Sequence, residues 1–351
     1  MRRAAAVLVL VLSVACTGGD DDGGRSAPTA ASMTTPAPTA SGLAAPTGAA
    51  PAPATPTATA SAPESSPSAA PATSPRPTAT ATPTPPPAAA ALPTPRPTYR
   101  PDRRAPHVAA VPTFRSAGEL ARVLAEASRQ IRDARTPPRQ VARAAELTQL
   151  AYHQLVTEEA WQPKVYATLP AALRGTAKAN VQAVQEIRIL NKPRPELPEW
   201  RIVDPLPAAE LMRYYRKAQR ATGIHWSYLA AINLVETRMG RIIGLSTAGA
   251  RGPMQFMPTT WDLVGRGDID DPHDSIQAAA RYLVDRGGPG DMAKAIRGYN
   301  NSARYVIAVQ NYAAEIRRHP RAWLEYYNWR TIFELEPREV LLLEGYQRRP
   351  G

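Results

Sequence analysis

Past residue 107, apolar side chains recur every three or four positions, and this spacing predicts a chain made mainly of amphipathic helices. Ser116 and Glu119 form a capping box, which predicts a helix that starts directly after Ser116. A second helical pattern follows Pro137-Pro138, and a third runs from Leu173 to Ile187. Patterns with the two-residue period of strands are nearly missing. The sequence therefore predicts a mainly α fold.

The second half of the chain repeats this pattern between residues with clear capping or stop character. Helices are expected over 208–222 with a stop at Gly223, over 226–238 with a stop at Gly240, from Pro258 onward, over 275–286 with Asp274 as N-cap, over 292–299, and over 303–318 with Ser302 as N-cap. The tail after Arg321 is rich in Trp and Tyr, and either a closing helix or an extension of a cleft would explain it.

A proline-rich stretch from Lys192 to Pro207 breaks the helical pattern and is the best candidate for a domain boundary. Residues 107–192 are then a helical accessory region, and residues 193–351 are a separate unit with an aromatic-rich C-terminal extension. The sequence leaves open whether the accessory region packs on that unit.

The first residues have the composition of an export signal. Arg2-Arg3 precede a short apolar run from Ala4 to Leu12, which is too short to span a bilayer as a stable helix. The run ends at Leu12-Ser13-Val14-Ala15-Cys16, which resembles a bacterial lipoprotein processing site, and Cys16 is the chain's only cysteine. We therefore expect a signal peptide over 1–16 and lipid attachment at Cys16, which would hold the exported protein on the outer face of the membrane. An ordinary secretory signal with an incidental cysteine is the alternative.

Residues 17–106 consist largely of Ala, Pro, Thr and Ser and hold 21 of the 38 prolines. Such a segment has too few large apolar side chains to offset the entropy cost of ordering. It is predicted to be a disordered linker with polyproline-II character. A glycosylated or merely neutral spacer is compatible with the same composition.

The net charge of the chain indicates which partners it would attract. The chain has 42 Lys and Arg against 30 Asp and Glu, and residues 1–106 hold eight and five of these. Residues 107–351 therefore hold 34 basic and 25 acidic residues, a net charge of +9. Anionic wall polymers or membrane surfaces would attract such a chain. Nucleic acid is not expected, because no basic cluster is interleaved with aromatic residues and the export signal argues against it.

The candidate chemistry centres on Glu236, at the end of the apolar run Trp226, Leu229, Ile232, Leu234 and Val235. A carboxyl surrounded by apolar side chains resists ionisation, so its pKa should rise toward neutral pH. Cleavage of a glycosidic bond requires such a proton donor. A glycine-rich loop and the turn Gly252-Pro253-Met254-Gln255-Phe256 follow. A helix-end carboxylate paired with Arg238 or Arg241 is the purely structural alternative.

Roughly residues 206–315 resemble the lytic transglycosylases of the lysozyme superfamily, which cut the glycan strands of bacterial peptidoglycan. The matching residues are Glu236, Ser246, Gly249-Ala250-Arg251-Gly252, Met254-Gln255 and, in a second motif, Tyr299-Asn300. The resemblance implies a lysozyme-like helical catalytic domain. It also implies that Glu236 is the acid, that Tyr299 hydrogen-bonds near it, and that Asn300 binds sugar. Ser246, Gly252, Met254, Gln255 and Phe256 would complete the substrate site.

Most glycosidases use two carboxylates, but only one is expected around Glu236. By the resemblance, this residue protonates the bond between N-acetylmuramic acid and N-acetylglucosamine and then activates the muramyl 6-hydroxyl, which gives a 1,6-anhydro product. Two alternatives remain: hydrolysis by water, as in goose-type lysozymes, and a catalytically weak wall-binding or scaffold protein. The histidines lack metal-ligand spacing, so we predict no metal and no cofactor.

Overall fold

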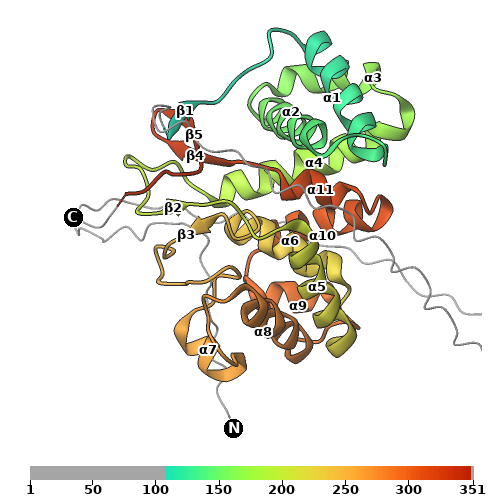
Figure 1. Cartoon of the computed structure of the whole chain (residues 1–351). Coiled ribbons are helices and arrows are strands. Elements are labelled where there is room, and N and C mark those ends of the chain that lie inside the picture. Colours follow the sequence, from blue (N-terminus) through green and yellow to red (C-terminus); the bar gives the residue numbers. More distant parts are fainter. Residues whose placement is uncertain (1–106, 349–351) are drawn as a thin grey trace, which may run out of the picture. The chain divides into compact units, whose positions relative to one another are not determined.

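The structure is a computed structural model that describes residues 107–348 (Figure 1). The signal peptide over 1–16, the lipid site at Cys16 and the linker over 17–106 lie outside the described residues. Within them, the predicted mainly helical fold is confirmed. No helix in this part of the chain has both the length and the apolar character needed to cross a membrane.

The first helices begin and end close to the predicted positions. They are α1 (Ala117–Arg132), α2 (Pro138–Thr157), α3 (Gln162–Thr168) and α4 (Ala171–Leu190), with a 3-10 turn at Glu159–Trp161. The Oγ of Ser116 accepts a hydrogen bond from the Glu119 amide at 3.2 Å, so the expected cap of α1 is confirmed. The short helix α3 was not predicted, because its one buried side chain, Val165, is too little to make a pattern.

The second half holds α5 (Ala208–Thr222), α6 (Trp226–Thr237), α7 (Pro258–Val264), α8 (Pro272–Asp285), α9 (Met292–Tyr299), α10 (Ala303–Arg318) and α11 (Ala322–Tyr327). Two capping predictions were wrong. Helix α6 ends in left-handed Arg238 before Gly240 is reached. Helix α8 is capped by the Asp271 side chain, which accepts from the Asp274 amide at 2.9 Å. Ser302 is the N-cap residue of α10 as predicted, although its side chain makes no capping hydrogen bond.

The sequence did not predict the sheet at the C-terminal end of the chain. Strands β4 (Thr331–Leu335) and β5 (Arg338–Leu342) form a hairpin, and β1 (Val108–Ala110) pairs antiparallel with β5 to give the order β1-β5-β4. A second pair joins β2 (Arg201–Ile202) to β3 (Ile242–Ile243). The aromatic tail is therefore a short helix followed by a hairpin. These strands are two to five residues long, too short for a periodic signal.

Residues 107–192 share one hydrophobic core with the helices that follow them, since a single buried cluster extends from α1 to α11. Buried side chains of α4 lie against α10, and the Tyr326 hydroxyl of α11 donates to Asn180 Oδ1 of α4 at 2.8 Å. The Arg321 guanidinium donates to the Ile131 carbonyl at the end of α1 at 2.9 Å. Residues 107–192 thus pack directly on the helices that follow them.

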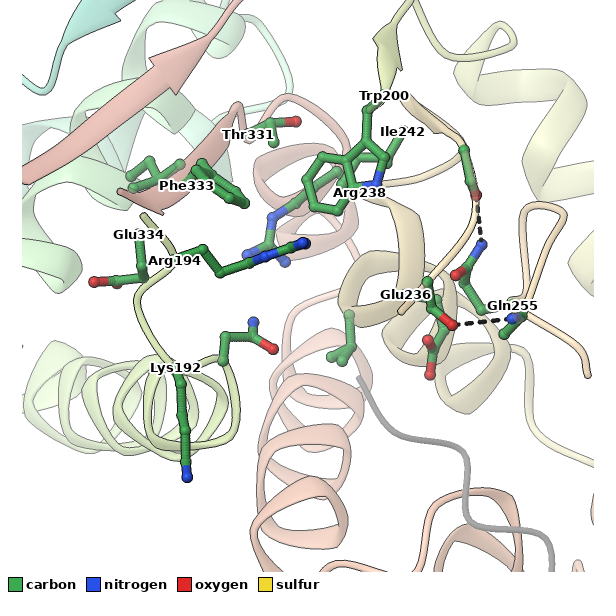
Figure 2. A pocket seen from close by; sticks show the side chains of 16 residues that line it. Lys192, Arg194, Trp200, Glu236, Arg238, Ile242, Gln255, Thr331, Phe333 and Glu334 are labelled. Atoms are coloured by element: carbon green, nitrogen blue, oxygen red, sulfur yellow. Dashed lines mark hydrogen bonds between the residues drawn. The ribbon is translucent and has the colours of Figure 1, made fainter. Parts of the chain in front are cut away.

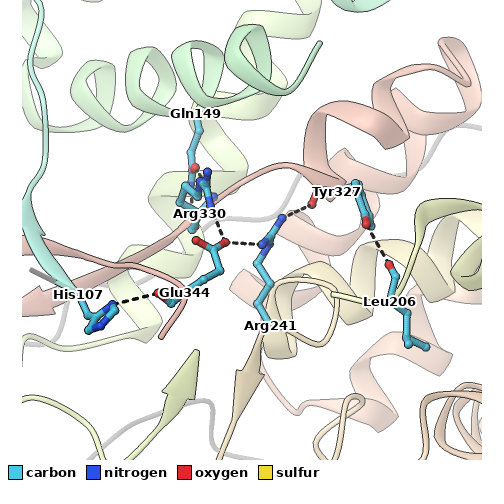
Figure 3. Close-up of polar contacts among 7 residues, drawn as sticks. All are labelled: His107, Gln149, Leu206, Arg241, Tyr327, Arg330 and Glu344. Carbon is cyan, nitrogen blue, oxygen red and sulfur yellow. Dashed lines mark hydrogen bonds and ion pairs between the residues drawn. The ribbon is translucent and has the colours of Figure 1, made fainter. Parts of the chain in front are cut away.

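Polar contacts of Arg330 and Glu344 hold the segment after α11 in place (Figure 3). Buried Glu344 accepts from Arg241 at 2.6 Å and from Arg330, and its backbone carbonyl accepts from His107 at 3.0 Å. Gln149 of α2 exchanges two hydrogen bonds, of 2.8 and 2.7 Å, with the backbone of Arg330. The segment is therefore fixed to three separate parts of the chain.

Candidate active site

Helix α6 is almost entirely buried and delivers Glu236 at its last turn. Every residue of the helix except Tyr228 is buried, so the helix lies inside the core with Glu236 near its C-terminal end. The helix then stops because Arg238 and Met239 adopt left-handed backbone angles, with φ of 53° and 64°. Their amides donate to the carbonyls of Leu234 and Asn233 at 3.1 Å each, which closes the helix end.

The Glu236 carboxyl is buried at 9% exposure, and one hydroxyl contacts it. The Tyr305 hydroxyl, from the first turn of α10, donates to Glu236 Oε1 at 2.6 Å. Burial raises the pKa of Glu236 to about 8, while the Tyr305 hydrogen bond opposes part of that rise. The carboxyl is therefore protonated at neutral pH, and its Oε2 has no hydrogen-bond partner among the described residues.

The hydroxyl that bonds Glu236 itself belongs to Tyr305, whereas Tyr299 bonds a neighbouring carbonyl. The Tyr299 hydroxyl donates to the Met254 carbonyl at 2.6 Å, and its ring lies nearly parallel to that of Tyr305, with centroids 6.4 Å apart. Tyr299 therefore braces the glycine loop and Tyr305 together. Tyr305 was missed because only the packing of α10 on α6 shows that it reaches Glu236.

The glycine loop is bound to the helix that carries Glu236. The Pro253 carbonyl accepts from Thr237 Oγ1 at 2.6 Å and from Asn233 Nδ2 at 2.8 Å. A side chain at Gly252, where φ is 78°, would collide with the Ile269 carbonyl, so only glycine fits. Ser246 Oγ accepts from the Ala250 amide at 2.9 Å and shapes the start of the loop.

A pocket opens beside Glu236, and two of the predicted substrate residues line it with the carboxyl (Figure 2). These are Ser246 and Gln255. Gln255 has a left-handed backbone with φ of 50°, and its side-chain amide donates to the Gly252 carbonyl at 3.0 Å. This strained conformation directs the Gln255 side chain toward the pocket.

The other predicted substrate residues do not line this pocket. Met254 and Phe256 are 0% and 2% exposed and pack in the core next to the loop, so neither side chain lines the pocket. Asn300, 5% exposed, ends α9, and Gly252 lies at the turn. The sequence pattern located this loop but could not separate its lining residues from its supporting ones.

The opposite wall of the pocket comes from segments that the sequence did not connect with the site. Asn191, Lys192, Arg194 and Trp200 lie on the stretch between α4 and α5, and Thr331 to Glu334 belong to β4. The rings of Trp200 and Phe333 pack edge to face, with their centroids 5.6 Å apart. Figure 2 shows Glu236 and Gln255 on one side and Arg194, Phe333 and Glu334 on the other.

Two clusters in the described part of the chain bring three possible metal-ligand atoms within 4.8 Å of one another, which the sequence spacing did not suggest. They are His153 with Glu334 and Glu339, and Asp271 with His273 and Asp274. Protein contacts already engage both: Arg188 pairs with Glu334 and Glu339 at 3.2 and 2.8 Å, and Lys217 contacts His273 at 2.9 Å. Neither cluster includes Glu236.

Comparison with known proteins agrees with this geometry. Residues 213–319 match the family model described as the transglycosylase SLT domain. This segment is an SLT domain. It contains Glu236, the glycine loop, Tyr299 and Tyr305, whereas Arg194, Trp200 and β4 lie outside it.

The chain is also similar to a named relative. Membrane-bound lytic murein transglycosylase F from Thiobacillus denitrificans is 36% identical over 75 residues, which are 21% of this chain and 16% of the relative. The chain therefore matches only about a sixth of that protein's length. No solved structure matches the chain.

Proposed function

We propose that this protein is a peptidoglycan lytic transglycosylase with Glu236 as its single catalytic carboxyl. The observation that carries the proposal is the state of Glu236: it is buried beside a pocket, its pKa is raised to about 8, and it therefore holds a proton at neutral pH. The SLT domain and the transglycosylase relative support the same reaction class.

The pocket offers no obvious second carboxylate for a nucleophile or base. Among the described lining residues, Glu334 is the other acid, and its carboxylate pairs with Arg188 at 3.2 Å. A mechanism in which the substrate supplies its own nucleophile fits this arrangement better than a two-carboxylate mechanism. The muramyl 6-hydroxyl is such a nucleophile.

In the proposed reaction, Glu236 donates its proton to the oxygen between N-acetylmuramic acid and N-acetylglucosamine as the C1–O bond breaks. The resulting carboxylate then takes the proton of the muramyl 6-hydroxyl while that oxygen bonds to C1. The 1,6-anhydro product forms without water, and Glu236 ends protonated, as it began. Tyr305 can donate to Oε1 throughout, which keeps the carboxyl in one orientation.

The remaining residues have supporting or binding roles in this proposal. Ser246 and Gln255 face the sugar from the pocket wall, and the Gln255 amide can pair with acetamido groups. Tyr299 acts by holding Tyr305 and the Met254 carbonyl in place. Gly252, Met254 and Phe256 keep the loop in shape, and Asn300 binds sugar beyond the described pocket.

We further propose that the protein works in the cell envelope, attached by a lipid at Cys16, with residues 17–106 as a linker between the membrane and the wall. Residues 107–192 would then be an accessory region and residues 193–351 the catalytic domain with its extension. The basic excess and the name of the membrane-bound relative support this location.

Digestion of purified sacculi followed by mass spectrometry tests the reaction. The proposal expects fragments with 1,6-anhydromuramyl ends from the wild-type protein and none from Glu236→Gln. Reducing ends alone would show that water is the nucleophile and would reject the transglycosylase assignment. If Glu236→Gln digests sacculi at the wild-type rate, Glu236 is not the acid.

A further inference from the structure

Two guanidinium groups project into the pocket beside Glu236 without a carboxylate partner. Arg194 comes from the stretch between α4 and α5, and Arg238 comes from the end of α6; both line the pocket (Figure 2). The Arg194 side chain makes no hydrogen bond or ion pair within residues 107–348. The Arg238 guanidinium donates to the Leu234 carbonyl at 2.9 Å, a neutral acceptor.

The acids nearest to these cations do not neutralise them. Glu236 is protonated at neutral pH, because burial raises its pKa to about 8. Glu334 turns its carboxylate away from Arg194 in Figure 2 and pairs with Arg188. Burial lowers the pKa of Arg238, as expected for a cation that leaves water without a carboxylate beside it. Buried or half-buried charges are normally paired, so this pocket lacks an anion.

The backbone is arranged to keep both arginines where they are. Arg238 occupies a left-handed conformation that costs a residue with a side chain on the order of 1 kcal/mol, and glycine would avoid that cost. Arg194 is fixed to the hairpin by two backbone hydrogen bonds, from its amide to the Glu334 carbonyl at 2.9 Å and from the Glu336 amide to its own carbonyl at 2.8 Å. The backbone at both arginines is thus fixed beside the pocket.

We propose that Arg194 and Arg238 form a carboxylate-binding subsite that recognises an acidic group on the muramyl residue next to the cleaved bond. The inference rests on the proposed function and adds a substrate preference to it. Guanidinium groups match the planar geometry of carboxylates, and muramic acid is the sugar of the strand that carries them, on its lactyl group or on an attached peptide. The subsite joins one residue inside the SLT domain to one outside it.

The test compares soluble glycan strands in three forms: with peptides, stripped of peptides so that the lactyl carboxylate is free, and with all carboxyls converted to neutral methylamides. Arg194→Gln should lower kcat/KM about tenfold on a form that supplies the recognised carboxylate and less than twofold on the neutral form. Loss on the peptide-bearing form alone places the carboxylate on the peptide, and loss on the stripped form places it on the lactyl group.

Arg139→Gln is the matched control. Arg139 is exposed near the start of α2 and is not among the residues that line the pocket. Its substitution removes the same charge but should change each rate less than twofold. Arg194→Lys should recover part of the loss, since it restores charge without the planar fork. Equal effects of Arg194→Gln on all three forms, or no effect on any, would overturn the subsite.

Binding keeps the subsite and the proposed function separable. Calorimetry on Glu236→Gln, with and without Arg194→Gln, measures affinity for the same strands without cleavage. Tighter binding of carboxylate-bearing strands that disappears with Arg194→Gln supports the subsite even if the wild-type protein cleaves nothing, which would reject the reaction alone. Cleavage without carboxylate-dependent binding would reject the subsite alone.

Discussion

At the scale of single residues, the chemistry depends on a carboxyl that is costly to ionise where it stands. Among the described residues, one hydrogen bond, from Tyr305, reaches the Glu236 side chain, which is buried at 9% exposure. Three residues with side chains and left-handed backbones, Arg238, Met239 and Gln255, lie next to this carboxyl in sequence or in the pocket. Such strain persists where the surrounding structure holds it, and it often marks functional sites.

The burial of Glu236 predicts a stability effect with a defined pH window. The pKa of Glu236 is raised from 4.5 to about 8 by folding, so its contribution to stability is full below pH 4.5 and is lost as pH rises to about 8. Glu236→Gln keeps an acceptor for Tyr305 and has no charge to bury. We expect nearly equal melting temperatures near pH 4.5 and a variant more stable by on the order of 4 kcal/mol at pH 8. If Glu236→Gln is instead less stable than the wild-type protein at pH 8, the Glu236 carboxyl is ionised and well solvated in the folded protein, and the prediction fails.

Two tyrosines distinguish direct from indirect contact with the acid. The Tyr305 hydrogen bond lowers the pKa of Glu236, so Tyr305→Phe should move the alkaline fall in kcat/KM to higher pH and reduce the rate about tenfold. Tyr299→Phe breaks the bond to the Met254 carbonyl instead, so it should cost about 1 kcal/mol of stability and leave the alkaline fall in place. A shift with Tyr299→Phe but not with Tyr305→Phe would contradict this assignment.

At the scale of elements, the helices could be predicted closely and the far wall of the pocket could not. The bounds of α5 and α10 follow from apolar spacing and from glycine or proline near their ends, which are local features. The hairpin and the stretch that carries Arg194 have no such signal, since β1 pairs with β5 across more than 200 residues of chain. The sequence therefore identified Glu236 and its loop but missed Arg194, Trp200 and β4.

The segment that follows the hairpin is expected to depend on one buried ion-pair cluster. Glu344 is buried and contacts both Arg330 and the buried Arg241, so Glu344→Gln removes the carboxylate that pairs with a buried cation. We expect a loss of about 3 kcal/mol in the free energy of unfolding, measured by urea titration. Glu196→Gln is the control, because Glu196 pairs with Arg348 at an exposed position and should cost less than about 0.5 kcal/mol. Equal losses would show that Glu344 is not critical to this region.

At the scale of the whole described chain, the SLT domain does not have a core of its own. Leu120 and Leu124 of α1 belong to the same buried cluster as Ile232 of α6 and Val309 of α10. The pocket likewise needs both sides, because Glu236 comes from inside the SLT domain and Arg194 from outside it. The proline-rich stretch that the sequence marks as a boundary thus connects two regions that are packed together.

This shared core predicts that residues 193–351 will not fold stably when expressed alone, although they contain the whole SLT domain. Removing residues 107–192 would expose the faces of α10 and α11 that pack on α4 and α2, and it would also remove β1 from its sheet. The fragment should bind a hydrophobic dye and lack a sharp thermal transition, whereas residues 107–351 should melt in one step. Because the N-terminal helices contribute packing, Leu124→Ala in the longer chain should cost about 2–4 kcal/mol and lower its single melting temperature. A fragment that melts cooperatively and cleaves glycan strands at the full rate would show that the accessory region serves another purpose.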